Sequence, residues 1–221
     1  MITFDQIRHD SALATYLSAG NAALGEMGYT EHGFAHARKV SNAAAQVLSH
    51  FGAEPREVEL ARIAGYMHDI GNMVNRDSHA LTGAVISFKI LTDMGMEPRE
   101  VAQIVTAIGN HDEGTGRPVS RVAAALFLAD KSDVRRSRVR SEVDVNRLDD
   151  IHDRVNYAVT QSDLIIEPGN DTICLKLIID TDICPVIEYF KIFMERMFMC
   201  KGACEFLGGR FSLVINDTTL M

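Results

Sequence analysis

The sequence contains no tryptophan and only 4 cysteines among its 221 residues. The cysteines, Cys174, Cys184, Cys200 and Cys204, all lie in the last quarter of the chain. No CxxC motif or Cys/His cluster joins them, which argues against a thiolate metal site. We therefore expect reduced, packed thiols, with a metal pair of Cys200 and Cys204, one helical turn apart, as the alternative.

Long hydrophobic runs are also absent. No apolar stretch approaches the ~18 residues that a membrane-spanning helix needs. The first ten residues, MITFDQIRHD, lack the basic-then-apolar pattern of a signal peptide. We therefore expect a cytoplasmic protein with no membrane partner.

The sequence also has fewer basic residues than acidic ones, 22 against 30. The net charge of −8 argues against non-specific binding of nucleic acid, so none is expected as a partner. Basic residues gather locally in one run, Arg135, Arg136, Arg138 and Arg140. A solvated or salt-bridged surface is the simple explanation of this run, and a collar around a phosphate is the alternative.

The first third of the chain has helical periodicity. The apolar fraction of 47% suffices for one ordinary domain with room for a small second one. Thr3 and Gln6 form a capping-box pattern that predicts one helix reaching Gly28. Thr30 then predicts the start of a second helix that carries His32 and His36 one turn apart.

A phrase of similar sequence occurs twice, in residues 54–71 and 97–114. Each copy begins with EPREV, contains a His-Asp pair thirteen residues after its Pro, and ends at a Gly. Pro at the first helical position and Gly past the last one predict two helices of the same extent. Both pairs then lie at the C-terminal ends of helices, at comparable heights if the helices pack in parallel. The repeated phrase is explained either by two helices that happen to start and stop alike or by a true duplication.

The remaining pattern predicts an α+β fold. A helix is expected from His79 to about Met94, and another from Ser120 through RVAAALFLADKSDV, which is apolar almost all round and therefore central. Strands are expected at 162–167 and 172–180, joined by the turn PGND, then a helix at 185–207 and a last strand, RFSLVI. We therefore expect a helical domain over residues 1–160 and a small ββαβ domain over residues 161–221.

Polar residues on helices that otherwise form the core indicate a metal site. Asp130 ends the apolar helix segment ALFLAD, where an unpaired carboxylate is costly. His36 shares a helix face with Val40 and Val47. Either residue alone is more simply a hydrogen-bonded core group, but five polar candidates on five core-forming helices favour a metal ion.

These residues resemble the signature of the HD-domain superfamily of metal-dependent phosphohydrolases. His36 in HARKV, His68-Asp69 in MHDIG and Asp130 in LADKSD match it in order and spacing, over roughly residues 30–140. His79 in HALTG and His111 in GNHDEG lie where the two-metal branches have additional histidines. Those branches include the HD-GYP cyclic-dinucleotide phosphodiesterases and the bacterial HD hydrolases of diadenosine tetraphosphate.

The resemblance implies two divalent transition-metal ions in a helical domain. Asp69 would bridge them, with His36, His68 and Asp130 on the first ion and His79 and His111 on the second. Histidine and carboxylate ligands without thiolate favour iron or manganese, with nickel, cobalt or zinc as alternatives. A third site using His32 and Asp112 is a further alternative, and a role of His32 in orienting ligands is favoured over it.

Two features depart from the cyclic-dinucleotide enzymes and separate this chain from their substrate. Arg117 replaces the Tyr of their GYP motif, and Asp112 replaces their second His. The two other His-Asp pairs lie outside the ligand set. For His9-Asp10 we expect a solvated or packing role, and for His152-Asp153 a structural or interdomain role, with substrate contact as the alternative.

The leading functional hypothesis is hydrolysis of a phosphoester or phosphoanhydride in a small nucleotide-like substrate. Asp69 would bridge the two ions that activate the attacking water, and Lys131 and Arg117 would bind phosphate oxygens. A mixed-valent di-iron oxygenase and a non-catalytic metal or nucleotide sensor are the alternatives. The small C-terminal domain could restrict substrate, form a homodimer or bind a regulator.

Overall fold

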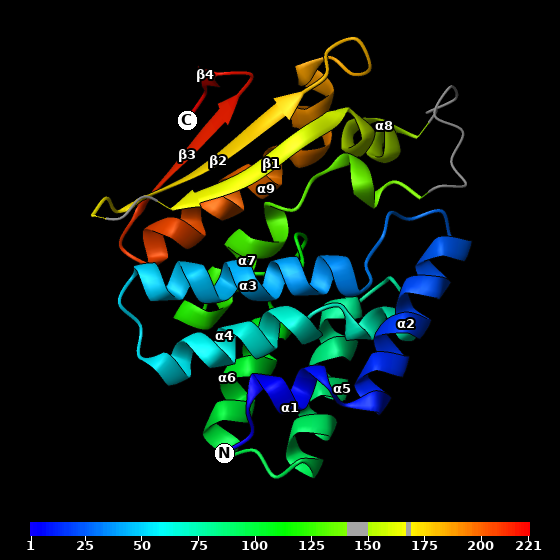
Figure 1. The fold of residues 1–221 in the computed structure, drawn as a ribbon, viewed down its shortest axis with the longest axis vertical. Helices are drawn as coiled ribbons and strands as arrows, with labels where there is room; N and C mark the ends of the chain where they lie inside the picture. Colours follow the sequence, from blue (N-terminus) through cyan, green and yellow to red (C-terminus); the bar gives the residue numbers. More distant parts are fainter. Residues whose placement is uncertain (141–149, 167–168) are drawn as a thin grey trace.

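The computed structural model describes residues 1–140, 150–166 and 169–221. It is mostly helical, with one small sheet near the C-terminus, which confirms the predicted α+β class. In Figure 1 the helices before residue 135 fill the lower part of the molecule, and the sheet lies above them. No helix in the described ranges has both the length and the apolar character needed to cross a membrane.

The N-terminal region forms two helices where the sequence predicted one. They are α1 (Phe4–Arg8) and α2 (Ser11–Glu26). The capping box of Thr3 and Gln6 is confirmed. The single-helix prediction is wrong because Asp10 adopts an extended conformation and its side chain accepts the backbone N–H of Leu13 at 2.8 Å, starting a new helix.

The helix that carries His36 begins later than predicted. α3 spans Phe34–His50 with Gly33 as its N-cap, so Thr30 is not the cap and His32 precedes the helix. Side chains outside the helix hold the segment before it: Asn21 Oδ1 accepts the backbone N–H of His32 at 3.0 Å, and Glu31 Oε1 accepts that of Gly33 at 2.6 Å. A helix from Thr30 would leave both N–H groups without an intrahelical partner, so these bonds satisfy them outside a helix.

The two helices of the repeated phrase are confirmed. They are α4 (Pro55–Met67) and α6 (Pro98–Gly109), each with Pro at its first turn. Between them lie the short 3₁₀ helix η1 (Ile70–Met73) and α5 (His79–Asp93). α7 spans Arg121–Lys131, one turn shorter than predicted, and is capped by Ser120, whose side chain accepts the N–H of Ala123.

The C-terminal region combines a mixed sheet with two helices. After the 3₁₀ helix η2 (Arg136–Arg138) come α8 (Ile151–Ala158), β1 (Val159–Ile166), β2 (Thr172–Ile179), α9 (Val186–Phe206), β3 (Arg210–Ile215) and β4 (Thr218–Thr219). The sheet order is β1-β2-β3-β4, antiparallel except for the β2–β3 pair. The predicted hairpin is confirmed, although Glu167 and Pro168 of its strand and turn lie outside the described residues. α8 and β4 were not predicted.

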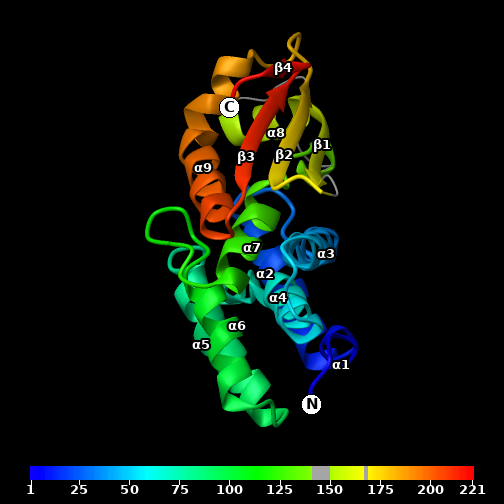
Figure 2. The same cartoon turned by 90° about the vertical axis from the view of Figure 1, so that its left-hand side faces the viewer.

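One helix connects the two parts of the core. Every residue of α7 from Val122 to Ala129 is buried, since α3, α4 and α6 pack on it together with α9. Figure 2 shows α9 along one face of the sheet and above α7. Alternate residues of β2 are buried, so one face of the sheet packs inward. The cysteines Cys184, Cys200 and Cys204 are buried and free, as expected for packed thiols.

Candidate metal centre

Six polar side chains from separate helices converge at one place in the helical part. They are the six predicted metal ligands, His36, His68, Asp69, His79, His111 and Asp130. The four histidines are at most 3% exposed and Asp69 is 6% exposed. Such burial of polar groups requires that they bind one another or a ligand.

The helix boundaries explain the convergence. His68-Asp69 follows the last residue of α4, and His111 follows α6 in the same way, because both helices begin at a Pro thirteen residues earlier. His79 is the first residue of α5, and Asp130 lies in the last turn of α7. The centre is therefore built where helices begin and end.

A glycine permits the close approach of α5. A Cβ on Gly71 would lie 2.0 Å from the carbonyl oxygen of His79 and 2.6 Å from the backbone nitrogen of Gly83. Only a residue without a side chain fits between the two segments. Gly71 thus determines how near His79 comes to Asp69.

The hydrogen bonds of the four imidazoles fix their tautomers. Each Nδ1 faces an acceptor: Asp133 Oδ2 at 2.8 Å for His36, and a backbone carbonyl at 2.6–3.0 Å for the others. Because a carbonyl oxygen can only accept, the proton of each neutral ring lies on Nδ1. Every Nε2 therefore presents a lone pair to the centre.

These lone pairs face one another. His36 Nε2 lies 3.2 Å from His68 Nε2, and His79 Nε2 lies 3.1 Å from His111 Nε2. The carboxylate of Asp69 lies between the two pairs. Its Oδ2 is 3.5 Å from His36 Nε2 and 3.4 Å from His68 Nε2, while its Oδ1 is 3.6 Å from His79 Nε2 and 4.0 Å from His111 Nε2.

This donor set fits divalent cations. Asp69 Oδ2 is buried without a hydrogen-bond partner, and Asp130 Oδ1 lies 3.3 Å from His36 Nε2. The ligand atoms of His36, His68 and Asp130 lie within 4.8 Å of one another, as do those of His68, Asp69 and His111. Imidazole nitrogens and carboxylate oxygens without thiolate suit borderline transition metals. A cation would satisfy all of these lone pairs at once.

Protons alone cannot neutralise the cluster. Burial by itself would lower the pKa of His68, but the carboxylates of Asp69 and Asp130 raise it to about 10. Burial, together with the charge on His68, lowers the pKa of His111 well below its usual range. Burial also lowers the pKa of His79, despite the opposing effect of Asp69. The positive charge thus resides on His68, while the pKa values of His79 and His111 are lowered, so the lone pairs of these two rings remain.

Two supporting residues were missed in the sequence. Asp133 is fully buried and accepts from His36 Nδ1, while Asn72 donates to Asp69 Oδ1 at 2.9 Å. Such outer partners orient metal ligands and set their tautomers. The sequence did contain a signal for both residues. Asn72 lies three residues after Asp69 and Asp133 three residues after Asp130, which is about one helical turn.

Lys131 lies against Asp130, one of the predicted metal ligands. Its Nζ is 2.8 Å from Asp130 Oδ2 and 3.4 Å from Glu113 Oε1, and its side chain is buried. The amine therefore neutralises Asp130 and turns the other oxygen of that carboxylate towards the histidines. Arg117 is exposed in the loop after α6, beside a pocket formed with α9. Phosphate binding by Lys131 and Arg117 stays a prediction.

The four arginines between residues 135 and 140 are not all directed into solvent. Arg135 pairs with Asp133 at 2.8 Å, and Arg136 donates to the carbonyl of Tyr157. Arg138 is 5% exposed and donates to the carbonyls of Glu31 and Asp133. Arg140 donates to the carbonyl of Tyr29. These residues bind the segment after α7 to the rest of the fold.

The remaining His-Asp pairs differ in position. His9 is exposed, 3.6 Å from Asp5, and Asp10 caps α2, which fits the expected solvated or packing role. His152, on α8, lines a cavity together with His32. The His152 ring also packs against that of Phe193 on α9, with centroids 6.4 Å apart, so both the structural and the substrate-contact role of His152 stay predictions.

His32 repeats the pattern of the ligand histidines. Its Nδ1 faces the carbonyl of Thr30 at 2.7 Å, and its ring centroid lies 5.5 Å from that of His36. Asp112 is partly buried beside His111. A third ion on His32 and Asp112 stays a prediction.

Comparison with known proteins identifies the region around this centre. Residues 33–135 match the HD domain. The matched region contains all six converging residues, so the resemblance noted from the sequence is confirmed for the HD domain itself. Membership of a two-metal branch stays a prediction.

Similar proteins include one named uncharacterized protein MJ1020, from Methanocaldococcus jannaschii. It is 28% identical over 171 residues, which are 67% of this chain and 65% of that protein. Ribonuclease Y of Oceanobacillus iheyensis is 23% identical over 196 residues, which are 86% of this chain and 35% of that protein. The chain thus spans less than two thirds of either relative.

A solved structure also aligns with the chain. It is described as a predicted HD superfamily hydrolase from an uncultured Thermotogales bacterium. The alignment covers 59% of this chain and 71% of that one, with 23% identity and a TM-score of 0.47.

Proposed function

We propose that this chain is a metal-dependent phosphohydrolase that cleaves a phosphoester or phosphoanhydride in a nucleotide-like substrate. One observation carries the proposal: four buried imidazoles, each with Nδ1 engaged, direct Nε2 towards two carboxylates. The match of this region to the HD domain supports hydrolase chemistry.

The ligand roles follow from the distances. His36, His68 and Asp130 would hold one ion, and His79 and His111 a second. Asp69 would serve both, because its two oxygens face opposite histidine pairs. Iron or manganese is proposed on the basis of this donor set.

Bound divalent ions would lower the pKa of a water to roughly 7 and neutralise phosphate oxygens. The protein side chains orient the reaction. Asp133 holds the His36 ring, Asn72 holds Asp69, and Lys131 holds Asp130. Because these contacts exist before substrate arrives, the centre needs little reorganisation during the reaction.

A second candidate is cleavage of RNA phosphodiesters. The similarity to ribonuclease Y extends over 86% of this chain and favours it. The net charge of −8 opposes it, because binding to a polyanion relies on basic surface. Small nucleotides are therefore proposed first.

The test is metal analysis joined to phosphate release. Protein purified without added metal should contain transition metal, and it should release phosphate or nucleotide from a panel of nucleotides without oxygen. Removal of metal with a chelator should abolish turnover, and manganese should restore it. Oxygen consumption coupled to substrate loss would instead support the oxygenase, and tight nucleotide binding without turnover would support the sensor.

A further inference from the structure

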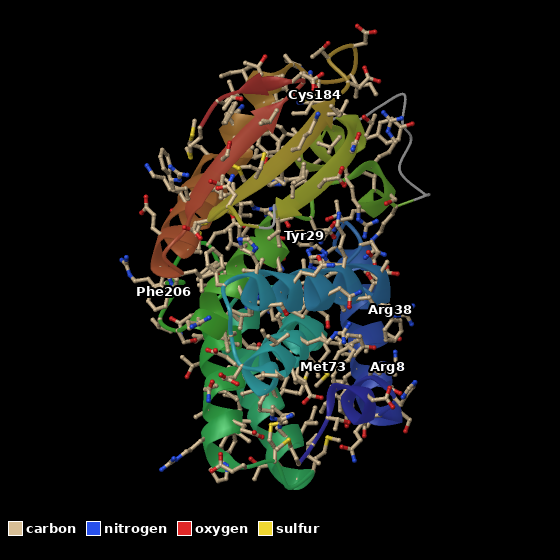
Figure 3. The ribbon with its side chains drawn as sticks, turned by 60° about the vertical axis from the view of Figure 1, so that its left-hand side comes forward. Arg8, Tyr29, Arg38, Met73, Cys184 and Phe206 are labelled. Carbon is tan, nitrogen blue, oxygen red and sulfur yellow. The ribbon has the colours of Figure 1, made fainter. Side chains whose placement is uncertain are left out.

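A cavity of about 380 Å³ adjoins the metal centre. Its wall joins the segment before α3, the segment before α5, η2, α8 and α9. The side chains that carry the argument are Tyr29, His32, Arg76, Arg138, His152 and Arg196. Figure 3 shows Tyr29 at the level where the helical part meets the sheet-bearing part.

Two contacts connect this cavity to the predicted ligands. The His32 ring lies against the His36 ring, with centroids 5.5 Å apart. Arg76 Nη1 lies 3.4 Å from His79 Nε2. The cavity therefore adjoins both histidine groups of the centre, with His32 and Arg76 lying between it and the predicted ligands.

Three guanidinium groups line the cavity, and each keeps N–H groups available. Arg138 Nε and Nη1 donate to the carbonyls of Glu31 and Asp133, but its Nη2 has no partner within the described ranges. Arg76 Nη1 makes two contacts of 3.4 Å, to Asn72 Oδ1 and His79 Nε2, and the guanidinium lies 5.6 Å from the centre of the Tyr29 ring. Arg196 Nε lies 2.5 Å from Glu113 Oε1 without the alignment of a hydrogen bond.

The cavity wall itself carries three arginines and two aspartates. Asp153 lies on α8, and Asp150 is the N-cap of α8 and accepts the N–H groups of His152 and Asp153. Outside the wall, Glu113 pairs with both Arg196 and Lys131, and Asp133 lies 4.0 Å from Arg138 while it also pairs with Lys39 and Arg135. Burial and the nearby Asp150 raise the pKa of Asp153. In a chain of net charge −8, this cluster of positive groups is unusual.

We propose that this cavity binds a second phosphate of the substrate, so that the substrate is a small molecule with at least two linked phosphates. The proposal rests on the proposed function: one phosphate lies at the metal centre, and Arg76, Arg138 and Arg196 hold the next. Guanidinium groups suit this role because their fixed fork of donors matches phosphate oxygens. A cavity of this size suits a small ligand more than a polymer.

Two of the three arginines lie outside the HD match. Arg138 and Arg196, like His152, follow residue 135, the last residue of the matched region, whereas Arg76 lies within it. The C-terminal part would thus supply specificity for a second phosphate, while the HD domain supplies the metal centre.

The test compares binding of the non-hydrolysable α,β-methylene analogue of adenosine diphosphate with binding of adenosine monophosphate to the metal-loaded full chain, in excess manganese, by calorimetry. We expect the diphosphate to bind more tightly. Arg196→Gln should weaken diphosphate binding by about 10- to 100-fold, the scale of a charge-assisted hydrogen bond, and change monophosphate binding by less than about 3-fold. Arg196→Lys should restore part of the preference.

Two variants control for indirect effects. Arg99→Gln removes an exposed arginine on α6 and should leave the preference unchanged. Glu113→Gln removes the ion pair of Arg196 but keeps the guanidinium, so the preference should persist. If Arg196→Gln does not fold, Arg76→Gln must lower the preference in its place.

Equal binding of the two nucleotides by the wild type would overturn the proposal, and so would an unchanged preference in Arg196→Gln. Cleavage of RNA together with equal nucleotide binding would overturn it in favour of an RNA substrate. Because binding is measured without turnover, a lack of hydrolysis would count against the proposed function alone.

Discussion

Gly71→Ala should displace one half of the metal centre. The new Cβ would lie 2.0 Å from the carbonyl oxygen of His79, 2.6 Å from Gly83 N and 2.7 Å from Thr82 Oγ1. Two of these atoms belong to the backbone of α5, so no side-chain rotation relieves the overlap. The first turn of α5 must retreat by at least about 1 Å to restore van der Waals contact.

The displacement is large compared with the tolerance of a metal site. Ligand distances vary by about 0.2 Å, so a shift of about 1 Å removes His79 from coordination. His36, His68 and Asp130 do not depend on this contact, so their ion should stay. Overpacking should also cost about 1–3 kcal/mol of stability. For a chain of this size, that predicts a fall in Tm of about 2–12 °C.

Elemental analysis and thermal denaturation measure the two effects. We expect the metal content per chain to fall by about half, and the chelator-treated variant to melt below the chelator-treated wild type. Gly202→Ala is the matched control, because a Cβ there meets nothing within 4 Å on α9. It should retain metal and gain up to ~1 kcal/mol of stability. Wild-type metal content and Tm in Gly71→Ala would refute the argument from close packing.

Three further predictions address individual side chains. Asp69→Asn should empty the whole centre, because both halves face its carboxylate, whereas Asp10→Asn should leave metal content unchanged by elemental analysis. Burial alone would raise the pKa of Asp133, but hydrogen bonding to a histidine and nearby positive charges hold it well below the usual range. Its contribution to stability is therefore present above the ordinary aspartate pKa of about 3.9 and lost as the pH falls below it. Urea unfolding of metal-free protein at pH 6 and pH 3 should show a smaller loss in Asp133→Asn than in the wild type. Lys131→Ala should lower kcat/KM by about 1.5–3 kcal/mol on phosphate substrates, and Arg117→Ala should lower it less, since Arg117 is exposed; the reverse order in steady-state kinetics would contradict this reading of the two residues.

Local patterns in the sequence were sufficient for the two helices that place His68 and His111, whereas the full ligand set came from the family resemblance. Pro at the start of α4 and α6 fixes where both helices end, and with it the position of His68 and His111. The start of α3 could not be predicted in this way. Asn21 and Glu31 hold the segment before it extended, and the contact from Asn21 joins residues far apart in the chain.

The arginines that line the cavity were even less predictable from local sequence patterns. Arg76 and Arg196 are separated by most of the chain, and neither lies in a pattern that marks a site. Their proximity depends on α9 packing against α7, which no local periodicity specifies. The arginine run at 135–140 is the densest cluster of positive charge in the sequence, yet three of these arginines donate to backbone carbonyls elsewhere in the fold.

The burial of α7 on all sides has a consequence for protein engineering. One side of the helix completes the bundle that holds the metal ligands, and the other is covered by α9. Ser162 Oγ in β1 also donates to the carbonyl of Ser132, just past α7, at 2.6 Å. Packing is therefore continuous across residue 160, and the division into two domains there stays a prediction. A chimera that keeps the bundle and exchanges the sheet would need a substitute for α9, so the helical bundle cannot simply be transferred by itself.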